Sequence, residues 1–73
     1  MKLVKVTYYT KDSVKSDGYK TYVYFDIDSL IRLRIFKKKL SFDDNLNFAV
    51  SRYEKFLGRY FIPGSIISVE HIS

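Results

Sequence analysis

The sequence predicts a small α+β protein, a single domain over residues 1–73. In it, one helix packs on one face of an antiparallel sheet of three to four strands, in the order β-β-β-α-β. Three observations support this prediction. A chain of 73 residues is the length of one domain. A hydrophobic content of 47% is higher than disordered chains have. Apolar residues alternate early in the chain and later recur at helical spacing.

Two strands are expected near the N-terminus. Residues 2–10 are β-branched and aromatic with partial alternation. The dipeptide Asp17-Gly18 is a strong turn signal, and residues 19–27 alternate again after it. The two strands would therefore form a hairpin. The residues expected on its covered face are Val4, Val6, Tyr8, Val23 and Phe25.

Residues 30–40 fit two kinds of secondary structure. A helix could begin at Asp28 or Ser29, which are both favourable N-caps, but its apolar side chains would scatter around the helix. A strand would sort the side chains onto two faces, one with Ile31, Leu33 and Ile35 and the other with Arg32, Arg34 and Phe36. We therefore favour a third strand and keep the helix as the alternative.

A helix is expected from about residue 43 to 57. Ser41 or Asp43 can cap its start, and Gly58 suits the position just after its last turn. Its apolar residues recur at helical spacing and are Leu46, Ala49, Val50, Tyr53 and Leu57. The opposite side is expected to hold Asn47, Ser51, Glu54 and Lys55.

A turn at residues 62–65 would lead into a last strand at residues 65–72. A single helix covers only one face of the resulting sheet. The other face would then be basic and aromatic. Its expected members are Lys5, Tyr9, Lys20, Tyr22, Tyr24, Arg32, Arg34 and Phe36.

The positive charge of the chain is concentrated in one segment. There are 13 Lys and Arg against eight Asp and Glu, which gives a net charge of +5. Residues 29–42 carry five basic residues and no acidic one, so the net charge of this segment equals that of the whole chain. Such a local excess suggests an anionic partner. The five basic residues are Arg32, Arg34, Lys37, Lys38 and Lys39.

No catalytic or metal-binding set emerges from the sequence. The chain has no Cys and a single His, His71, so it cannot form disulfides, a thiolate zinc site or a Cys-His pair. Residues 23–30 superficially resemble the nucleophile motif of haloacid-dehalogenase-type phosphatases, in which Asp-x-Asp follows a hydrophobic strand. However, Ser-Leu replaces the Gly-Thr of that motif, and the chain is too short for the doubly wound sheet of that family. We expect Asp26 and Asp28 to form a turn, and we expect no enzyme, cofactor or metal.

Composition favours a cytoplasmic protein. The absence of Cys fits a reducing compartment. No apolar run approaches the length of a membrane span, and Lys5 interrupts any hydrophobic stretch after Met1. We therefore expect neither a signal peptide nor a membrane partner.

Two non-enzymatic functions fit the expected basic and aromatic face. Such a face can bind nucleic acid when rings stack on bases and Lys or Arg contact phosphates. The alternative is a protein–protein interaction module, an inhibitor or assembly partner, or a homodimer that uses the same face. If residues 30–40 were helical, the nucleic-acid hypothesis would lose most of its support. The residues expected to bind are Lys20, Tyr22, Tyr24, Arg32, Arg34, Phe36, Lys37, Lys38 and Lys39.

Overall fold

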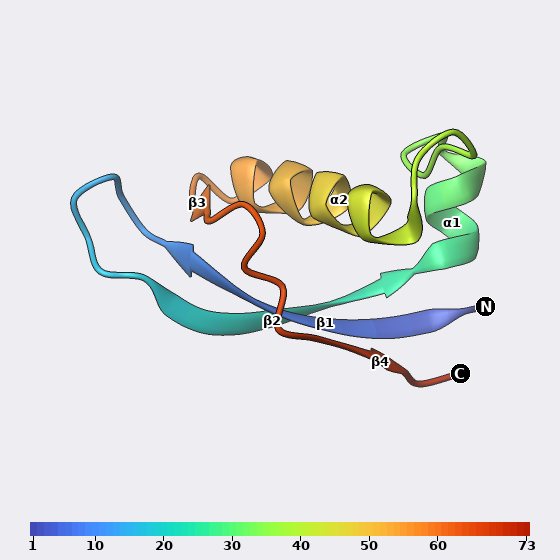
Figure 1. The fold of residues 1–73 in the computed structure, drawn as a ribbon, viewed down its shortest axis with the longest axis horizontal. Helices are drawn as coiled ribbons and strands as arrows, with labels where there is room; N and C mark the ends of the chain where they lie inside the picture. The colour runs from blue at the N-terminus through green and yellow to red at the C-terminus, as the bar shows by residue number, and fades with distance from the viewer.

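The computed structural model describes residues 1–73 and shows a four-stranded antiparallel sheet with both helices on one side (Figure 1). The elements in chain order are β1 (Leu3–Lys11), β2 (Tyr19–Asp26), α1 (Ile27–Arg32), α2 (Phe42–Phe56), β3 (Tyr60–Phe61) and β4 (Ser68–His71). The predicted α+β class, with a helix packed on one face of the sheet, is confirmed. Both chain termini lie at the same end of the molecule (Figure 1).

Strand β1 is the centre of the sheet. On one side it pairs antiparallel with β2, so that Val6 lies opposite Val23. On the other side it pairs with β4, where Val6 lies opposite Val69, and with β3, where Thr10 lies opposite Phe61. Strand β2 therefore forms one edge of the sheet, and the two short strands β3 and β4 share the other.

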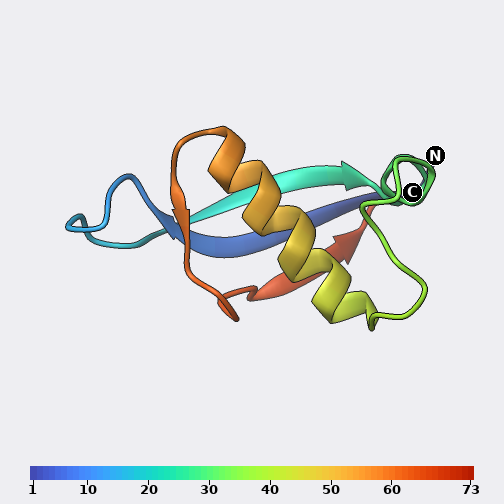
Figure 2. The same ribbon diagram turned by 90° about the horizontal axis from the view of Figure 1, so that it is seen from above.

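The hydrophobic core lies between the sheet and α2, which crosses the sheet diagonally (Figure 2). Alternate residues of β1 point into this core because side chains of a strand alternate between its faces. The predicted covered face of the hairpin is confirmed, with Phe25 partly buried at its margin. The buried hydrophobic residues are Val4, Val6, Tyr8, Val23, Ile27, Leu30, Leu46, Ala49 and Val50.

Helix α2 matches the predicted helix within one residue at each end. At its start, the Ser41 hydroxyl accepts a hydrogen bond from the Asp44 N–H at 3.1 Å, as an N-cap does. At its end, the N–H groups of Gly58 and Arg59 donate to carbonyls of the last turn at 3.0 and 2.9 Å. Gly58 has φ of 74°, so this is a Schellman ending with glycine in the left-handed region.

The predicted third strand is wrong, because residues 27–32 form helix α1 directly after β2. The Asp26 carboxylate caps this helix by accepting the Asp28 N–H at 3.2 Å, where we expected only a turn between strands. Ile27 and Leu30 are buried one helical turn apart. The order of elements is therefore β-β-α-α-β-β.

The alternation of apolar residues at 31–35 led to the wrong prediction of a strand. Helix α1 has six residues and buries only two side chains, so the other apolar residues need not follow a helical spacing. Ile31 and Leu33 are 52% and 67% exposed, so they do not contribute the face that the strand pattern assigned to them. After α1 the chain reverses at Arg34, which has φ of 62°. The Ile35 N–H then donates to the Leu30 carbonyl at 2.9 Å, and Ile35 packs against the core from the loop.

The C-terminal part is confirmed in its turn and in the position of its last strand. The Ser65 N–H donates to the Ile62 carbonyl at 3.1 Å, and Gly64 has φ of 76°. The ladder of β4 is shorter than the predicted strand at residues 65–72. The two-residue strand β3 was not predicted, because a strand of that length leaves no alternation to detect.

Candidate interaction surface on the sheet

The face of the sheet opposite α2 is covered by no helix (Figure 1). Because side chains alternate along each strand, the paired registers show which residues share this face. The three tyrosines on it, Tyr9, Tyr22 and Tyr24, are 40%, 55% and 50% exposed. We call this surface the outer face, and its members are Leu3, Lys5, Thr7, Tyr9, Lys20, Tyr22, Tyr24, Asp26, Ser68 and Glu70.

Side chains of the outer face contact one another in a defined arrangement. The rings of Tyr22 and Tyr24 meet edge to face, with their centroids 5.7 Å apart. The Lys5 ammonium lies 4.5 Å from the centroid of the Tyr22 ring, which is a cation–π distance. In the sheet register, Lys5 also lies between Tyr24 on β2 and Glu70 on β4. The centre of the face is therefore aromatic, with its main cation already in contact with a ring.

Six of the nine predicted binding residues do not lie on the outer face. Arg32 belongs to α1, where its guanidinium donates to the Ser29 hydroxyl at 2.9 Å. Phe36 packs against the core and meets the Phe42 ring at 5.9 Å. Because the strand was wrong, the predicted single face divides into two surfaces. The residues that the outer face retains are Lys20, Tyr22 and Tyr24, and those that it loses are Arg32, Arg34, Phe36, Lys37, Lys38 and Lys39.

The displaced cations lie in α1 and in the loop before α2, on the helix side of the molecule (Figure 1). We call them the basic segment, which consists of Arg32, Arg34, Lys37, Lys38 and Lys39. All five are exposed, and none forms an ion pair, since the ion pairs of the structure join Met1 to Asp28 and Arg59 to Glu54. The basic segment is therefore a second surface, separate from the tyrosines.

The buried side chain of Asn45 holds the basic segment to α2. Its Oδ1 accepts the Lys37 N–H at 2.8 Å, and its Nδ2 donates to the Lys37 carbonyl at 2.9 Å and to the Leu40 carbonyl at 3.3 Å. Asn45 is only 4% exposed, so these bonds satisfy an amide that would otherwise be costly to bury. The backbone from Lys37 to Leu40, which carries the lysine side chains, is therefore held in a fixed position relative to α2.

Sequence reasoning missed a buried polar cluster between the sheet and α2. Glu54 was expected on the exposed side of the helix but has no solvent exposure. Its Oε2 accepts the Tyr8 hydroxyl at 2.7 Å, and its two oxygens accept Arg59 at 3.0 and 2.6 Å. A signal existed, because Glu54 lies four residues after Val50 and so shares its stripe on the helix.

The ionisation of this cluster is that of a structural ion pair. Burial raises the pKa of Glu54, but hydrogen bonds from Arg59 and Tyr8 outweigh it, so the net pKa lies below the usual value. Burial, together with the hydrogen bond to Glu54, raises the pKa of the Tyr8 hydroxyl well above its ordinary value. The hydrogen bonds to Glu54 also raise the pKa of Arg59. At neutral pH the carboxylate is therefore ionised, and both of its partners keep their protons.

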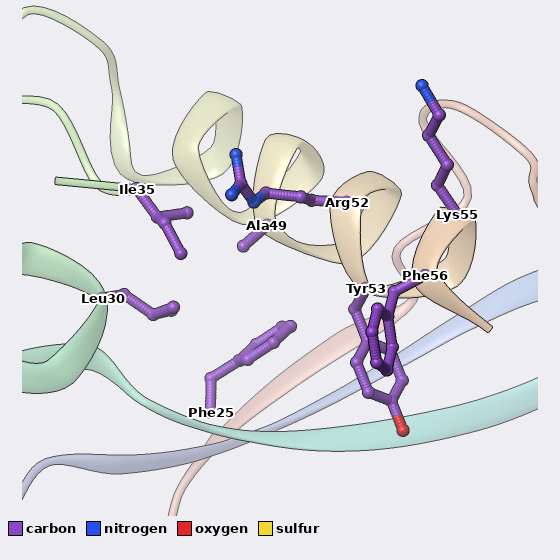
Figure 3. Close-up of a pocket in the computed structure, with 8 residues that line it drawn as sticks. All are labelled: Phe25, Leu30, Ile35, Ala49, Arg52, Tyr53, Lys55 and Phe56. Atoms are coloured by element: carbon purple, nitrogen blue, oxygen red, sulfur yellow. The ribbon is translucent and has the colours of Figure 1, made fainter. Parts of the chain in front are cut away.

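A groove of about 570 Å³ opens between α2, α1 and the end of β2 (Figure 3). Six of its eight lining residues are hydrophobic, and Phe56 among them is 86% exposed. Lys55 points away from the groove, as Figure 3 shows. The lining residues are Phe25, Leu30, Ile35, Ala49, Arg52, Tyr53, Lys55 and Phe56.

No group of three or more His, Asp or Glu side chains is arranged so that it could hold a metal ion. Neither helix has the length and the apolar character that crossing a membrane requires. No protein-family model matches the chain, and neither the curated proteins nor the solved structures contain a significant match to it. The features from which a function can be proposed are the outer face, the basic segment and the edge of β2, which pairs with no strand other than β1.

Proposed function

We propose that the chain is a non-enzymatic protein-interaction module whose contact surface is the outer face of the sheet. The observation that carries this proposal is the uncovered set of tyrosines, Tyr9, Tyr22 and Tyr24, on a regular two-stranded ladder. Tyrosine is enriched at the energetic centres of protein interfaces, because its ring buries a large apolar area and its hydroxyl still finds a hydrogen-bond partner. An exposed patch of this kind typically marks an interaction site.

The charge of the outer face supports a protein partner over a polyanion. The face carries Lys5 and Lys20 against Asp26 and Glu70, and Lys11, at its hairpin end, donates to the Val14 carbonyl at 3.4 Å. Nucleic-acid affinity depends on several cations that neutralise phosphates. The cations expected to supply it lie in the basic segment instead, so the face is nearly neutral.

The arrangement of the outer face also lowers the cost of binding. The Tyr22 ring contacts both the Tyr24 ring and the Lys5 ammonium. A side chain that is already ordered loses little conformational entropy when a partner covers it. These tyrosines are therefore suited to be the anchoring residues of an interface.

The proposal is tested with variants of the face against a purified partner. A binding protein would be captured from the organism that encodes the chain, purified, and titrated by isothermal calorimetry. Tyr22→Ala and Tyr24→Ala are each expected to weaken binding at least about tenfold. The matched control is Phe48→Ala, because Phe48 is a similarly exposed aromatic residue of α2, on the other side of the sheet.

Two outcomes would contradict the proposal. The first is an unchanged dissociation constant for the double variant Tyr22→Ala/Tyr24→Ala. The second is an equal loss of affinity in Phe48→Ala, which would place the interface on the helix side.

A second candidate function, nucleic-acid binding by the basic segment, is favoured by its five exposed cations that form no ion pair. Fluorescence anisotropy with labelled single-stranded DNA, duplex DNA and RNA tests it directly. Affinity should fall steeply between low and physiological salt, because binding releases counterions. Undetectable binding to all three at low salt would eliminate this candidate.

A further inference from the structure

We propose that the edge of β2 is the contact strand of a symmetric homodimer, in which the β2 strands of two copies pair antiparallel about a two-fold axis at Val23. The occupant of this edge is a second copy of the chain. The inference concerns the backbone edge of the sheet, so it does not depend on what binds the outer face.

The backbone of β2 has a free hydrogen-bonding edge. The Ile27 N–H donates to the Lys2 carbonyl at 2.9 Å, which fixes the parity of the ladder between β1 and β2. In an antiparallel ladder, successive residues direct their N–H and C=O groups to opposite sides. The odd-numbered residues of β2 therefore bond to β1, and the groups of Lys20, Tyr22 and Tyr24 point away from the sheet. No other strand pairs with β2.

The middle of this edge lacks the features that normally prevent strand addition. Exposed edges are usually protected by proline, charge, bulges or a covering segment. Between Thr21 and Phe25 there is no charged residue, glycine or proline, and the register with β1 runs without a bulge. Figure 2 shows β2 at the border of the sheet, with no strand beside it, although the last turns of α2 extend past this border. The residues of this stretch are also strong β-formers.

The charges at the two ends of β2 select one pairing. With the axis at Val23, Lys20 of each copy lies opposite Asp26 of the other, and Tyr22 lies opposite Tyr24. With the axis at Tyr22, Lys20 would instead lie opposite Tyr24, and Asp26 would lie opposite Gly18, which carries no charge. A parallel pairing in register would bring Lys20 beside Lys20. Opposite charges directly across a ladder stabilise it and like charges destabilise it, so the axis at Val23 is favoured.

The Asp26 carboxylate carries its charge at the pH of the cell. Hydrogen bonds from the Ser29 hydroxyl and the Lys2 N–H lower its pKa below the usual value. The same carboxylate remains partly exposed, so it can face an incoming ammonium. The complementarity with Lys20 therefore needs no change in the fold of either copy.

Pairing at this edge would also bring apolar side chains together on the helix side. Val23 would meet Val23 of the second copy, and Thr21 of that copy would lie opposite Phe25, which lines the groove of Figure 3. A chain of 73 residues has a small core, and association is one way in which such domains gain stability. The dimer would join the two outer faces into one continuous sheet surface.

Single-cysteine variants test the pairing and its register, because the native chain has no Cys. In Val23→Cys, the two sulfur-bearing residues would form a non-hydrogen-bonded pair with Cα atoms about 4.5 Å apart, which is within disulfide range. Mild oxidation should convert this variant to a disulfide-linked dimer on a non-reducing gel. In the matched control Thr21→Cys, the cysteines of the two copies would be about 13 Å apart along the strand and should not cross-link.

Three results would overturn the inference. These are no cross-link in folded Val23→Cys, equal cross-linking in Thr21→Cys, and faster cross-linking in Tyr22→Cys, which would move the axis to Tyr22. Far-UV circular dichroism establishes that each variant is folded.

A solution-mass measurement tests the unmodified chain. Sedimentation equilibrium should show the 8.7 kDa chain doubling in mass as its concentration rises. Tyr22→Pro removes an outward N–H that the fold does not use, so it should be folded and monomeric. Tyr22→Ala keeps that N–H and should still dimerise, although it should bind the protein partner of the outer face more weakly. A wild-type chain that stays monomeric at millimolar concentration would overturn the inference and leave the outer-face proposal unaffected.

Discussion

The Arg59 guanidinium donates two hydrogen bonds to the Glu54 carboxylate, 3.0 Å from Nε to Oε1 and 2.6 Å from Nη2 to Oε2. Glu54 is fully buried, whereas the Arg59 side chain is 26% exposed. The Tyr8 hydroxyl donates to the same carboxylate from the central strand at 2.7 Å. The cluster therefore connects three parts of the chain: the last turn of α2, the connection from α2 to β3, and strand β1.

Removal of Arg59 should destabilise the fold strongly, because it leaves a buried carboxylate without its cation. We expect Arg59→Met to lower the free energy of unfolding by about 3 kcal/mol, the lower end for a buried pair, since Arg59 is partly exposed. Glu54→Gln keeps an acceptor for Tyr8 and removes the charge. The double variant should therefore lose less than the sum of the two single variants, as measured by urea denaturation.

Arg52→Met is the matched control for this cycle, because Arg52 is an exposed arginine of α2, the helix that carries Glu54. Its effect should stay within about 0.5 kcal/mol. Additive losses in the double variant would show that the two side chains do not stabilise each other.

The raised pKa of Tyr8 predicts a loss of stability in alkali. The unfolded tyrosine ionises near pH 10, whereas the folded Tyr8 stays protonated above that value. Its contribution is therefore complete below about pH 10 and is lost as the pH rises further. Tyr8→Phe should cost about 1 kcal/mol at neutral pH and should flatten the decline between pH 9 and 11. Parallel declines in the stability of the two proteins would contradict the prediction.

The sequence predicts the hairpin well because its information is local. Val4, Val6 and Tyr8 alternate with polar or exposed residues, and this alternation fixes which side chains enter the core. The tyrosines Tyr22 and Tyr24 were placed on the open face for the same reason. The predicted placement of these two side chains on the open face, which depends on strand alternation, is therefore confirmed.

The rest of the site depends on contacts that the local pattern of the sequence leaves open. The stretch after Asp26 is apolar enough to form a strand or a helix. The Asp26 side chain caps the Asp28 N–H, which favours the helix. Glu54 is buried because Tyr8, 46 residues away, provides a donor. The free edge of β2 follows from the order of strands in the sheet, which the sequence alone leaves open.

Two helix ends of this chain provide a matched test of left-handed backbone. Arg34 and Gly58 occupy the same position after α1 and α2, with φ of 62° and 74°. A residue with a side chain is strained by about 1–2 kcal/mol in this region. Glycine avoids this strain but loses more conformational entropy on folding, which offsets part of the gain. Arg34→Gly should therefore stabilise the protein by about 0.5–1 kcal/mol, and Gly58→Arg should destabilise it by a similar amount.

Thermal unfolding followed by circular dichroism measures both changes. A shift of 1 kcal/mol moves the Tm of a domain of this size by about 4–8 °C. Arg34→Ala is the control for the lost charge, because it keeps the strained backbone and should not raise the Tm. A rise in Arg34→Ala equal to that of Arg34→Gly would assign the effect to charge repulsion within the basic segment.

The separation of the two surfaces predicts which cations respond to a polyanion. On a heparin column, the triple variant Lys37→Gln/Lys38→Gln/Lys39→Gln should elute at clearly lower salt than the wild type, because these lysines form no ion pairs within the chain. The matched variant Lys5→Gln/Lys20→Gln should elute close to the wild type, because Lys5 is already in contact with the Tyr22 ring. The opposite order of elution would mean that the outer face binds polyanions, and would favour nucleic acid as its partner.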